Sequence, residues 1–180
     1  NLGGLKMSKK QVNEKFTFKD IIVTVILSVI AFLLISSVIR LTTVMGHSMS
    51  QTLYDGEKLI ISKIAYNKED PKYKDVVVIK RSDLNVKYII KRVIAVEGDT
   101  LKIINNKLYI NDKLIEENYI NEKMQTSDLE IKIPKDKIFV MGDNRNNSID
   151  SRSSIIGLID QKDIEGKVIF NLSQFKKFKS

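Results

Sequence analysis

A serine and a lysine in separate short strings are the side chains of this sequence best suited to peptide chemistry. Ser48 lies in Gly46-His47-Ser48-Met49, and Lys91 opens Lys91-Arg92-Val93-Ile94. A serine hydroxyl becomes a strong nucleophile when a neighbouring base takes its proton, and a neutral lysine amine can be that base. The pair therefore indicates acyl transfer by a Ser/Lys dyad.

The residues around Lys91 suggest how its amine would lose its proton. On a strand, Lys91 shares one face with Ile89 and Val93. Apolar surroundings disfavour the ammonium form and lower its pKa, by up to about 3–5 units from roughly 10.4 when burial is complete. Arg92 would then point to solvent or to the opposite face of the sheet. The alternative is an edge lysine whose ammonium group reaches solvent.

A third cluster, Met141 to Arg152, is dense in Asp, Asn, Arg and Ser. Such side chains bond to the backbone and to one another, so the cluster predicts a rigid turn beside an active site. Asp150 and Arg152 are spaced to share one side of an extended segment. Calcium binding is the alternative, but it needs a regular series of oxygen ligands, and Arg145 and Arg152 argue against it.

Histidine and cysteine content limits the chemistry further. His47 is the single histidine, and there is no cysteine, which excludes disulfides, thiolate metal sites and His-based metal sites. His47 neighbours Ser48 directly, and adjacent residues of an extended segment point to opposite faces. It is therefore a poor base for that serine, and we expect neither a metal nor a cofactor.

An uncharged apolar run from Ile21 to Ile39 precedes the serine. A helix of this length spans about 28 Å, close to the hydrocarbon thickness of a bilayer. Lysines are frequent before the run and absent from Leu41 to Tyr54, so the positive-inside rule places the N-terminus in the cytoplasm. The alternative is a cleaved secretory signal, whose apolar region is usually shorter.

The sequence thus divides into a cytoplasmic tail (1–20), a single-pass transmembrane helix (21–39) and an extracytoplasmic catalytic domain (41–180). Beyond Arg40 the pattern changes to short runs of β-branched residues, and Asn105-Asn106 predicts a tight hairpin. We expect a mainly β domain, an antiparallel sheet or partly closed barrel, with residues 111–135 as an excursion or surface loop. The expected strands are 58–61, 75–79, 88–96, 100–104, 107–110, 137–141 and 167–170.

The chain is basic, with a formal charge of +8 from 30 Lys and Arg against 22 Asp and Glu. The lysines alternate with other residues along the whole chain, which favours a solvated surface, with an anionic membrane surface as the alternative. Predicted export and the lack of a clustered aromatic and basic surface argue against a nucleic-acid partner.

The apolar run, Gly46–Leu53, Lys91–Asp99 and Gly142–Arg152, in this order, resemble bacterial type I signal peptidases of the compact Gram-positive kind. These are membrane-anchored serine proteases that remove signal peptides from exported preproteins. The resemblance implies that Ser48 is the nucleophile and that Lys91 is the general base. It implies further roles in orientation and support for Ser148, Asp150, Arg152, Asp143 and Arg145: Ser148 would orient the lysine, Asp150 and Arg152 would form an ion pair, and the others would hold the loop.

The resemblance also suggests an oxyanion hole and a substrate pocket. The Ser48 N–H would be one oxyanion donor, and a backbone N–H at the Gly46 position or a water would be the second. Gly46 would also let a substrate backbone approach closely. Gln51 stands where the family usually has proline, which would loosen this segment. The expected pocket for small substrate residues is lined by Met45, Met49, Ile90 and either Val77 or Val78.

We expect a monomer that acts on preproteins at the lipid bilayer. Two further classes remain open from the sequence. One is a self-cleaving Ser/Lys repressor, against which the apolar run and the lack of a helix-turn-helix pattern argue. The other is a catalytically silent, membrane-tethered binding module, which only an activity assay would exclude.

Overall fold

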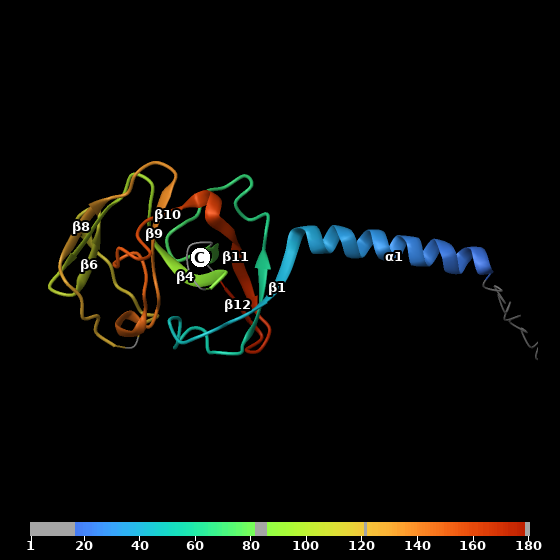
Figure 1. Cartoon of the computed structure of the whole chain (residues 1–180), viewed down its shortest axis with the longest axis horizontal. Helices are drawn as coiled ribbons and strands as arrows, with labels where there is room; N and C mark the ends of the chain where they lie inside the picture. The colour runs from blue at the N-terminus through green and yellow to red at the C-terminus, as the bar shows by residue number, and fades with distance from the viewer. Residues whose placement is uncertain (1–16, 82–85, 121, 179–180) are drawn as a thin grey trace, which may run out of the picture. The chain divides into compact units, whose positions relative to one another are not determined.

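The computed structural model describes residues 17–81, 86–120 and 122–178. The chain separates into two units, Asn1–Ser36 and Ser37–Ser180, and Figure 1 shows a long helix in the first and strands throughout the second. Most of the predicted cytoplasmic tail, residues 1–16, lies outside the described residues.

Helix α1, Phe18–Val38, begins at a capping box. The Thr17 N–H donates to the Asp20 carboxylate at 2.8 Å, and the Asp20 N–H donates back to the Thr17 hydroxyl at 3.3 Å. No residue of α1 is buried, and among the described residues it is the one helix long and apolar enough to cross a membrane. The predicted run 21–39 is therefore helical except for Ile39, which opens the first strand.

The larger sheet is antiparallel and has the strand order β1-β2-β11-β3-β4-β9-β10, with β12 paired to β11. Two short 3₁₀ helices, Arg145–Asn147 and Gln161–Asp163, join its later strands. The strands are β1 (Ile39–Thr43), β2 (Lys58–Ser62), β3 (Val76–Lys80), β4 (Tyr88–Val96), β9 (Lys137–Met141), β10 (Ile159–Asp160), β11 (Ile164–Asn171) and β12 (Lys176–Lys177). The mainly β antiparallel prediction is confirmed.

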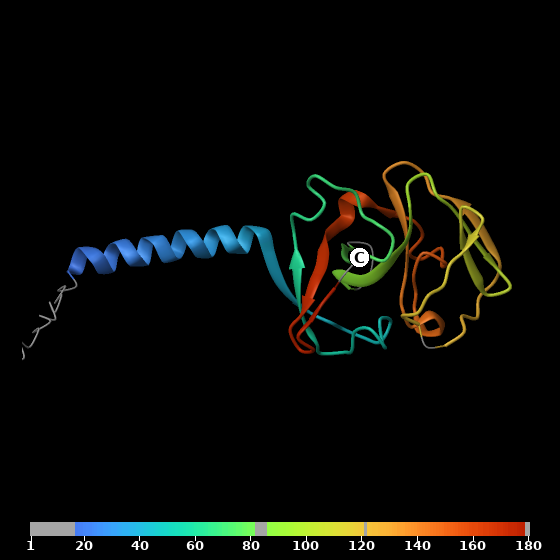
Figure 2. The same ribbon diagram turned by 180° about the vertical axis from the view of Figure 1, so that it is seen from behind.

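A second, four-stranded sheet has the order β7-β6-β5-β8. In the ribbon it lies on the opposite side of β9 and β10 from β11 (Figure 1, and from behind in Figure 2). Its strands are β5 (Thr100–Ile104), β6 (Lys107–Ile110), β7 (Lys113–Leu114) and β8 (Leu129–Lys132). The predicted hairpin is confirmed, because Asn105 and Asn106 adopt φ of 50° and 63°, the two left-handed residues of a type I′ turn.

The segment 111–135 is more than the predicted surface loop. It supplies β7 and β8 and buries Met124 and Ile133 in the core beneath the smaller sheet. Of the two alternatives, an excursion or a surface loop, the surface loop is wrong, and the strands were not predicted because the apolar residues of this segment are widely spaced among polar ones. A half-buried edge strand needs few of them.

Strand β3 is covered on both faces, which explains its unbroken apolar run. Val76 and Val78 pack in a cluster with Met49 and Leu53, whereas Val77 and Ile79 pack in a separate cluster with Val93 and Val140. The first of these clusters supports the segment after β1, where Ser48 lies.

Candidate active site

The predicted nucleophile and base meet in the structure. Lys91, on β4, has its Nζ 2.6 Å from the Oγ of Ser48. Only 4% of the Lys91 surface is exposed. Burial lowers the pKa of its ammonium group to about 8, against an opposing effect of the Asp150 carboxylate. A substantial fraction of the amine is therefore neutral at mildly alkaline pH, as a general base requires.

The turn that carries Ser48 is fixed on both sides. Gly46 adopts φ of +85°, a left-handed conformation that glycine takes without steric cost. On the other side Met49 is buried and its carbonyl accepts the Leu53 N–H at 2.8 Å. A Cβ at Gly46 would meet nothing within 4 Å. The backbone conformation therefore favours glycine here, and the close approach of a substrate predicted from the sequence stays a prediction.

The Gly46 N–H donates to Asp55 Oδ1 at 2.7 Å. This N–H is therefore engaged in this conformation, and the use of Gly46 as a second oxyanion donor stays a prediction. The Ser48 N–H, by contrast, makes no hydrogen bond to the residues that the structure describes. It remains available to a developing oxyanion.

Gln51 adopts φ of 88°, in the left-handed region. A residue with a side chain pays on the order of 1 kcal/mol there. Proline is locked near φ of about −65° and cannot adopt this conformation. A proline at this position would therefore require another backbone conformation, and the looser segment predicted from the sequence stays a prediction.

Gly142 lies against the nucleophile. A Cβ added to it would stand 2.4 Å from the Ser48 carbonyl oxygen and 2.3 Å from Ser148 Oγ, so no side chain fits. Its N–H donates to Asp150 Oδ2 at 2.9 Å, and its carbonyl accepts from Arg145 Nε at 3.0 Å. The Met141–Arg152 segment thus holds one glycine against the backbone of Ser48.

The Ser148 hydroxyl oxygen is buried, and no hydrogen bond joins it to Lys91, whose Nζ instead contacts Ser48 Oγ. The bond to Lys91 that the resemblance implied is therefore not formed in this conformation. Ser148 also faces Asp150, where it helps to hold the pKa of that carboxyl below its usual value.

Asp150 and Arg152 form the expected ion pair. Arg152 Nε donates to Asp150 Oδ1 at 2.8 Å and its Nη2 donates to Oδ2 at 2.8 Å. Burial alone would raise the pKa of the Asp150 carboxyl, but Arg152 and the Gly142 N–H outweigh it and hold that pKa below its usual value. Asp150 therefore stays ionised beside the lysine.

Asp143 and Arg145 each bind a residue from outside the Met141–Arg152 segment. Asp143 pairs with Arg92, whose Nη2 and Nε lie 2.6 and 2.8 Å from the two carboxylate oxygens. Arg145 pairs with Glu117 at 2.5 and 2.7 Å. Of the two expectations for Arg92, solvent or the opposite face of the sheet, solvent is wrong, because Arg92 is buried and stacks 4.2 Å from the centre of the Tyr119 ring.

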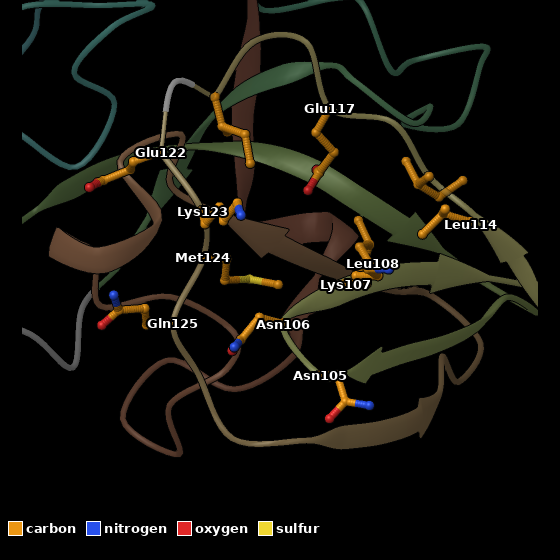
Figure 3. Close-up of a pocket in the computed structure, with 12 residues that line it drawn as sticks. Asn105, Asn106, Lys107, Leu108, Leu114, Glu117, Glu122, Lys123, Met124 and Gln125 are labelled. Atoms are coloured by element: carbon orange, nitrogen blue, oxygen red, sulfur yellow. The ribbon is translucent and has the colours of Figure 1, made fainter.

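Sequence reasoning missed Glu117, Tyr119 and Asn144. The first two stand in a polar segment without periodicity, so no spacing pointed to them. Glu117 also lines a cavity of about 630 Å³ beside the smaller sheet, where it lies above Leu108 and Met124 (Figure 3). Asn144 donates through its side chain to the His47 carbonyl at 3.0 Å.

A groove of about 390 Å³ opens at the dyad, lined by residues of β1 and of the first half of β4 together with Ser48 and Lys91. Of the predicted pocket residues, Met45, Val78 and Ile90 line this groove. Met49 is buried in the cluster to which Val78 belongs. Val77 belongs to the other cluster, so Val78 is the member of the predicted pair that faces the groove.

A buried lysine in contact with a serine, in a β fold, is the arrangement of a Ser/Lys hydrolase. The sequence profile described as "Signal peptidase, peptidase S26" matches residues 18–173. Signal peptidase I P of Bacillus subtilis subsp. natto is 37% identical over 171 residues, which cover 89% of this chain and 91% of the relative. The chain therefore belongs to the signal peptidase family, peptidase S26.

Two further relatives support this membership. Signal peptidase I of Bacillus licheniformis is 34% identical over 183 residues, covering 94% of this chain and 97% of the relative. Signal peptidase IB of Staphylococcus aureus N315 is 37% identical over 169 residues, covering 84% and 86%. Membership makes the chain a serine endopeptidase that removes signal peptides, as the sequence predicted.

Proposed function

We propose that Ser48 and Lys91 carry out the removal of signal peptides, with Ser48 as nucleophile and neutral Lys91 as general base. The observation that carries the proposal is the 2.6 Å separation of their Nζ and Oγ atoms. Burial of the amine, which brings its pKa to about 8, supports the role of base.

In the proposed mechanism, Lys91 Nζ takes the Ser48 hydroxyl proton as Oγ bonds to the scissile carbonyl carbon. The carbonyl electron pair moves to oxygen, where the Ser48 N–H stabilises it. Collapse breaks the C–N bond, and the Lys91 ammonium group protonates the leaving amine. Water then attacks the acyl-enzyme and gives a proton to Lys91, and Ser48 is regenerated. These steps use only side chains of this chain and water.

The groove supports binding of the cleavage region as an added strand. The residues Tyr88–Lys91 pair with β3 on one side, while β9 pairs only from Arg92 onward. Strand β1 ends the order of the larger sheet. An extended substrate has backbone groups to meet along both edges, and Met45, Val78 and Ile90 offer apolar contact to small side chains.

The orientation at the membrane is part of the proposal. Helix α1 spans the bilayer once, with the N-terminus in the cytoplasm and residues 41–180 outside, and the enzyme acts as a monomer. The excess of lysines before the helix supports this orientation. Labelling of a single cysteine introduced at exposed Ile155 by a membrane-impermeant reagent in intact cells tests it. Protection from the reagent would contradict the orientation.

Processing of a purified preprotein by the full-length chain in detergent tests the dyad. Wild type is expected to release the signal peptide, whereas Ser48→Ala and Lys91→Ala are expected to be inactive while unfolding at a similar or higher temperature. Processing by either folded variant at the wild-type rate would refute the assignment.

A further inference from the structure

Asn144 forms hydrogen bonds to the backbone on both sides of the nucleophile. Its N–H donates to the Ser48 carbonyl at 3.0 Å. Its side-chain Nδ2 donates to the His47 carbonyl, also at 3.0 Å. Two neighbouring peptide groups, one before and one after the Ser48 Cα, are thus bound by one residue.

The side chain of Asn144 does not cap its own helix. Asn144 is the N-cap residue of the 3₁₀ helix Arg145–Asn147, yet it makes no side-chain cap hydrogen bond. An asparagine in this position ordinarily binds an N–H of its own helix. Here its amide group is directed to the loop of the nucleophile instead.

The bond to His47 acts on the proposed oxyanion donor. The His47 carbonyl and the Ser48 N–H belong to one amide group, so a donor at the oxygen polarises the N–H at the other end. Such cooperative strengthening is about 10–30% per bond. The Ser50 N–H also donates to the His47 oxygen at 3.0 Å, so this peptide plane is held by two donors.

We infer that Asn144 is a positioning residue of the oxyanion hole, which orients and polarises the His47–Ser48 peptide. This inference rests on the proposed function, because it presupposes that Ser48 forms the tetrahedral intermediate. Both hydrogen bonds of Asn144 go to backbone carbonyls and neither involves the Ser48 hydroxyl or the Lys91 amine, so the assigned effect runs through the Ser48 N–H. It contributes more to the transition state, where the oxyanion exists, than to the bound substrate.

The same loop offers a matched control. Asn146 makes two side-chain hydrogen bonds: its Nδ2 donates to the Lys123 carbonyl at 3.0 Å, and its Oδ1 accepts the Gln125 N–H at 2.8 Å. Neither bond reaches the nucleophile turn. Asn146→Ala removes both of these bonds, one more than Asn144→Ala removes, without affecting the His47–Ser48 peptide.

The experiment measures kcat and KM of the full-length chain in detergent with a signal-peptide substrate, across pH. Removal of a direct oxyanion donor costs about 10²–10³ in kcat. Because Asn144 supplies about 10–30% of the strength of such a bond, Asn144→Ala is expected to lower kcat by about 2- to 8-fold. The KM of Asn144→Ala is expected to stay within about twofold of the wild-type value, and its pH of half-maximal rate is expected to equal that of wild type. Asn144→Asp, which sets an anion against the His47 carbonyl, falls at least as far, while Asn146→Ala keeps its kcat.

Binding of a peptide aldehyde provides a second readout, because its adduct with Ser48 carries the oxyanion. Asn144→Ala is expected to weaken the aldehyde by the same factor as kcat/KM, with an uncleavable substrate peptide bound as before. If Asn144→Ala does not fold, Asn144→Ser is used in its place. Serine keeps a hydroxyl that can cap the 3₁₀ helix but is too short to reach the His47 carbonyl.

Wild-type kcat in folded Asn144→Ala or Asn144→Ser would overturn the inference, as would a loss seen only in KM or only as a shifted pH profile. Ser48→Ala is measured in parallel. If Ser48→Ala still processes the substrate, the proposed function itself fails. If Ser48→Ala is silent while the Asn144 variants are fully active, only the inference fails.

Discussion

Arg92, the residue next to the proposed base, is joined to Asp143 by a buried ion pair with 2.6 and 2.8 Å contacts. The pair links β4, which carries Lys91, to Gly142, which lies against the Ser48 carbonyl. The segments that carry Ser48 and Lys91 are thus connected by an ion pair that is buried from solvent.

Substitution of Asp143 tests how this ion pair affects the pKa of Lys91. Asp143→Asn removes a carboxylate that raises the pKa of Lys91 and leaves the Arg92 cation uncompensated. Both effects disfavour the ammonium form, so we expect the pH of half-maximal kcat/KM to fall. The variant should also lose about 3–5 kcal/mol of stability.

The control is Asp160→Asn, which breaks the half-exposed pair with Lys137. Because solvent screens this pair, the variant is expected to unfold much as wild type does and to leave the pH profile in place. An unmoved profile in folded Asp143→Asn would show that Asp143 does not act on the base.

The pair between Arg145 and Glu117 predicts a large difference between neighbouring glutamates. Side-chain exposure is 0% for Arg145 and 6% for Glu117, so Glu117→Ala leaves a buried cation without its partner. We expect a loss of about 3–5 kcal/mol, measured by denaturant unfolding. Glu116→Ala, at an exposed neighbour, should stay within about 0.5 kcal/mol. Equal stability of the two variants would contradict the structural role of the pair.

Gly142→Ala should abolish activity through steric contact with the nucleophile turn. The new methyl group would lie 2.4 Å from the Ser48 carbonyl oxygen and 2.3 Å from Ser148 Oγ. Truncating Ser148 to glycine in the double variant relieves only the second contact, so processing should not recover. Recovery would mean that the Ser148 side chain, and not the Ser48 backbone, is what excludes a side chain at Gly142.

Gln51 gives a test of backbone conformation behind the nucleophile. Because its φ is 88°, Gln51→Gly should be tolerated, whereas Gln51→Pro forces φ to about −65° and should cost more than about 1 kcal/mol together with activity. Thermal unfolding and preprotein processing of both variants provide the measurement. Greater stability of the proline variant would contradict the left-handed conformation.

Burial of Lys91 should itself reduce stability at neutral pH. Its folded pKa of about 8 lies below the unfolded value of about 10.4. Between these pH values the unfolded chain binds more protons, so the free energy of unfolding rises with pH from about 8 to about 10. Lys91→Met should therefore be more stable than wild type at pH 7, by up to about 3 kcal/mol, with the advantage fading above about pH 10. Lys80→Met, at an exposed lysine, should show no such trend.

Local sequence patterns were enough to predict much of the fold. The bounds of β4 and the hairpin at Asn105-Asn106 follow from β-branched runs and turn residues, which act over a few positions. The Val77 and Val78 alternatives could not be separated, because a strand buried on both faces shows no alternation.

The partners in the candidate site depend on contacts between distant segments. Nothing near Arg92 in the sequence points to Asp143, and nothing near Arg145 points to Glu117. The engagement of the Gly46 N–H by Asp55 likewise depends on how the turn closes. Such pairings appear only once the sheets bring the segments together.

The central claim is that a neutral Lys91 activates Ser48, and the pH dependence of single-turnover cleavage by the full-length chain tests it most directly. The base must be deprotonated, so the rate should rise with pH and reach half its maximum near the lysine pKa of about 8. A rate that is independent of pH between about 6 and 10, or that reaches half its maximum only near the free lysine value of about 10.4, would contradict the account.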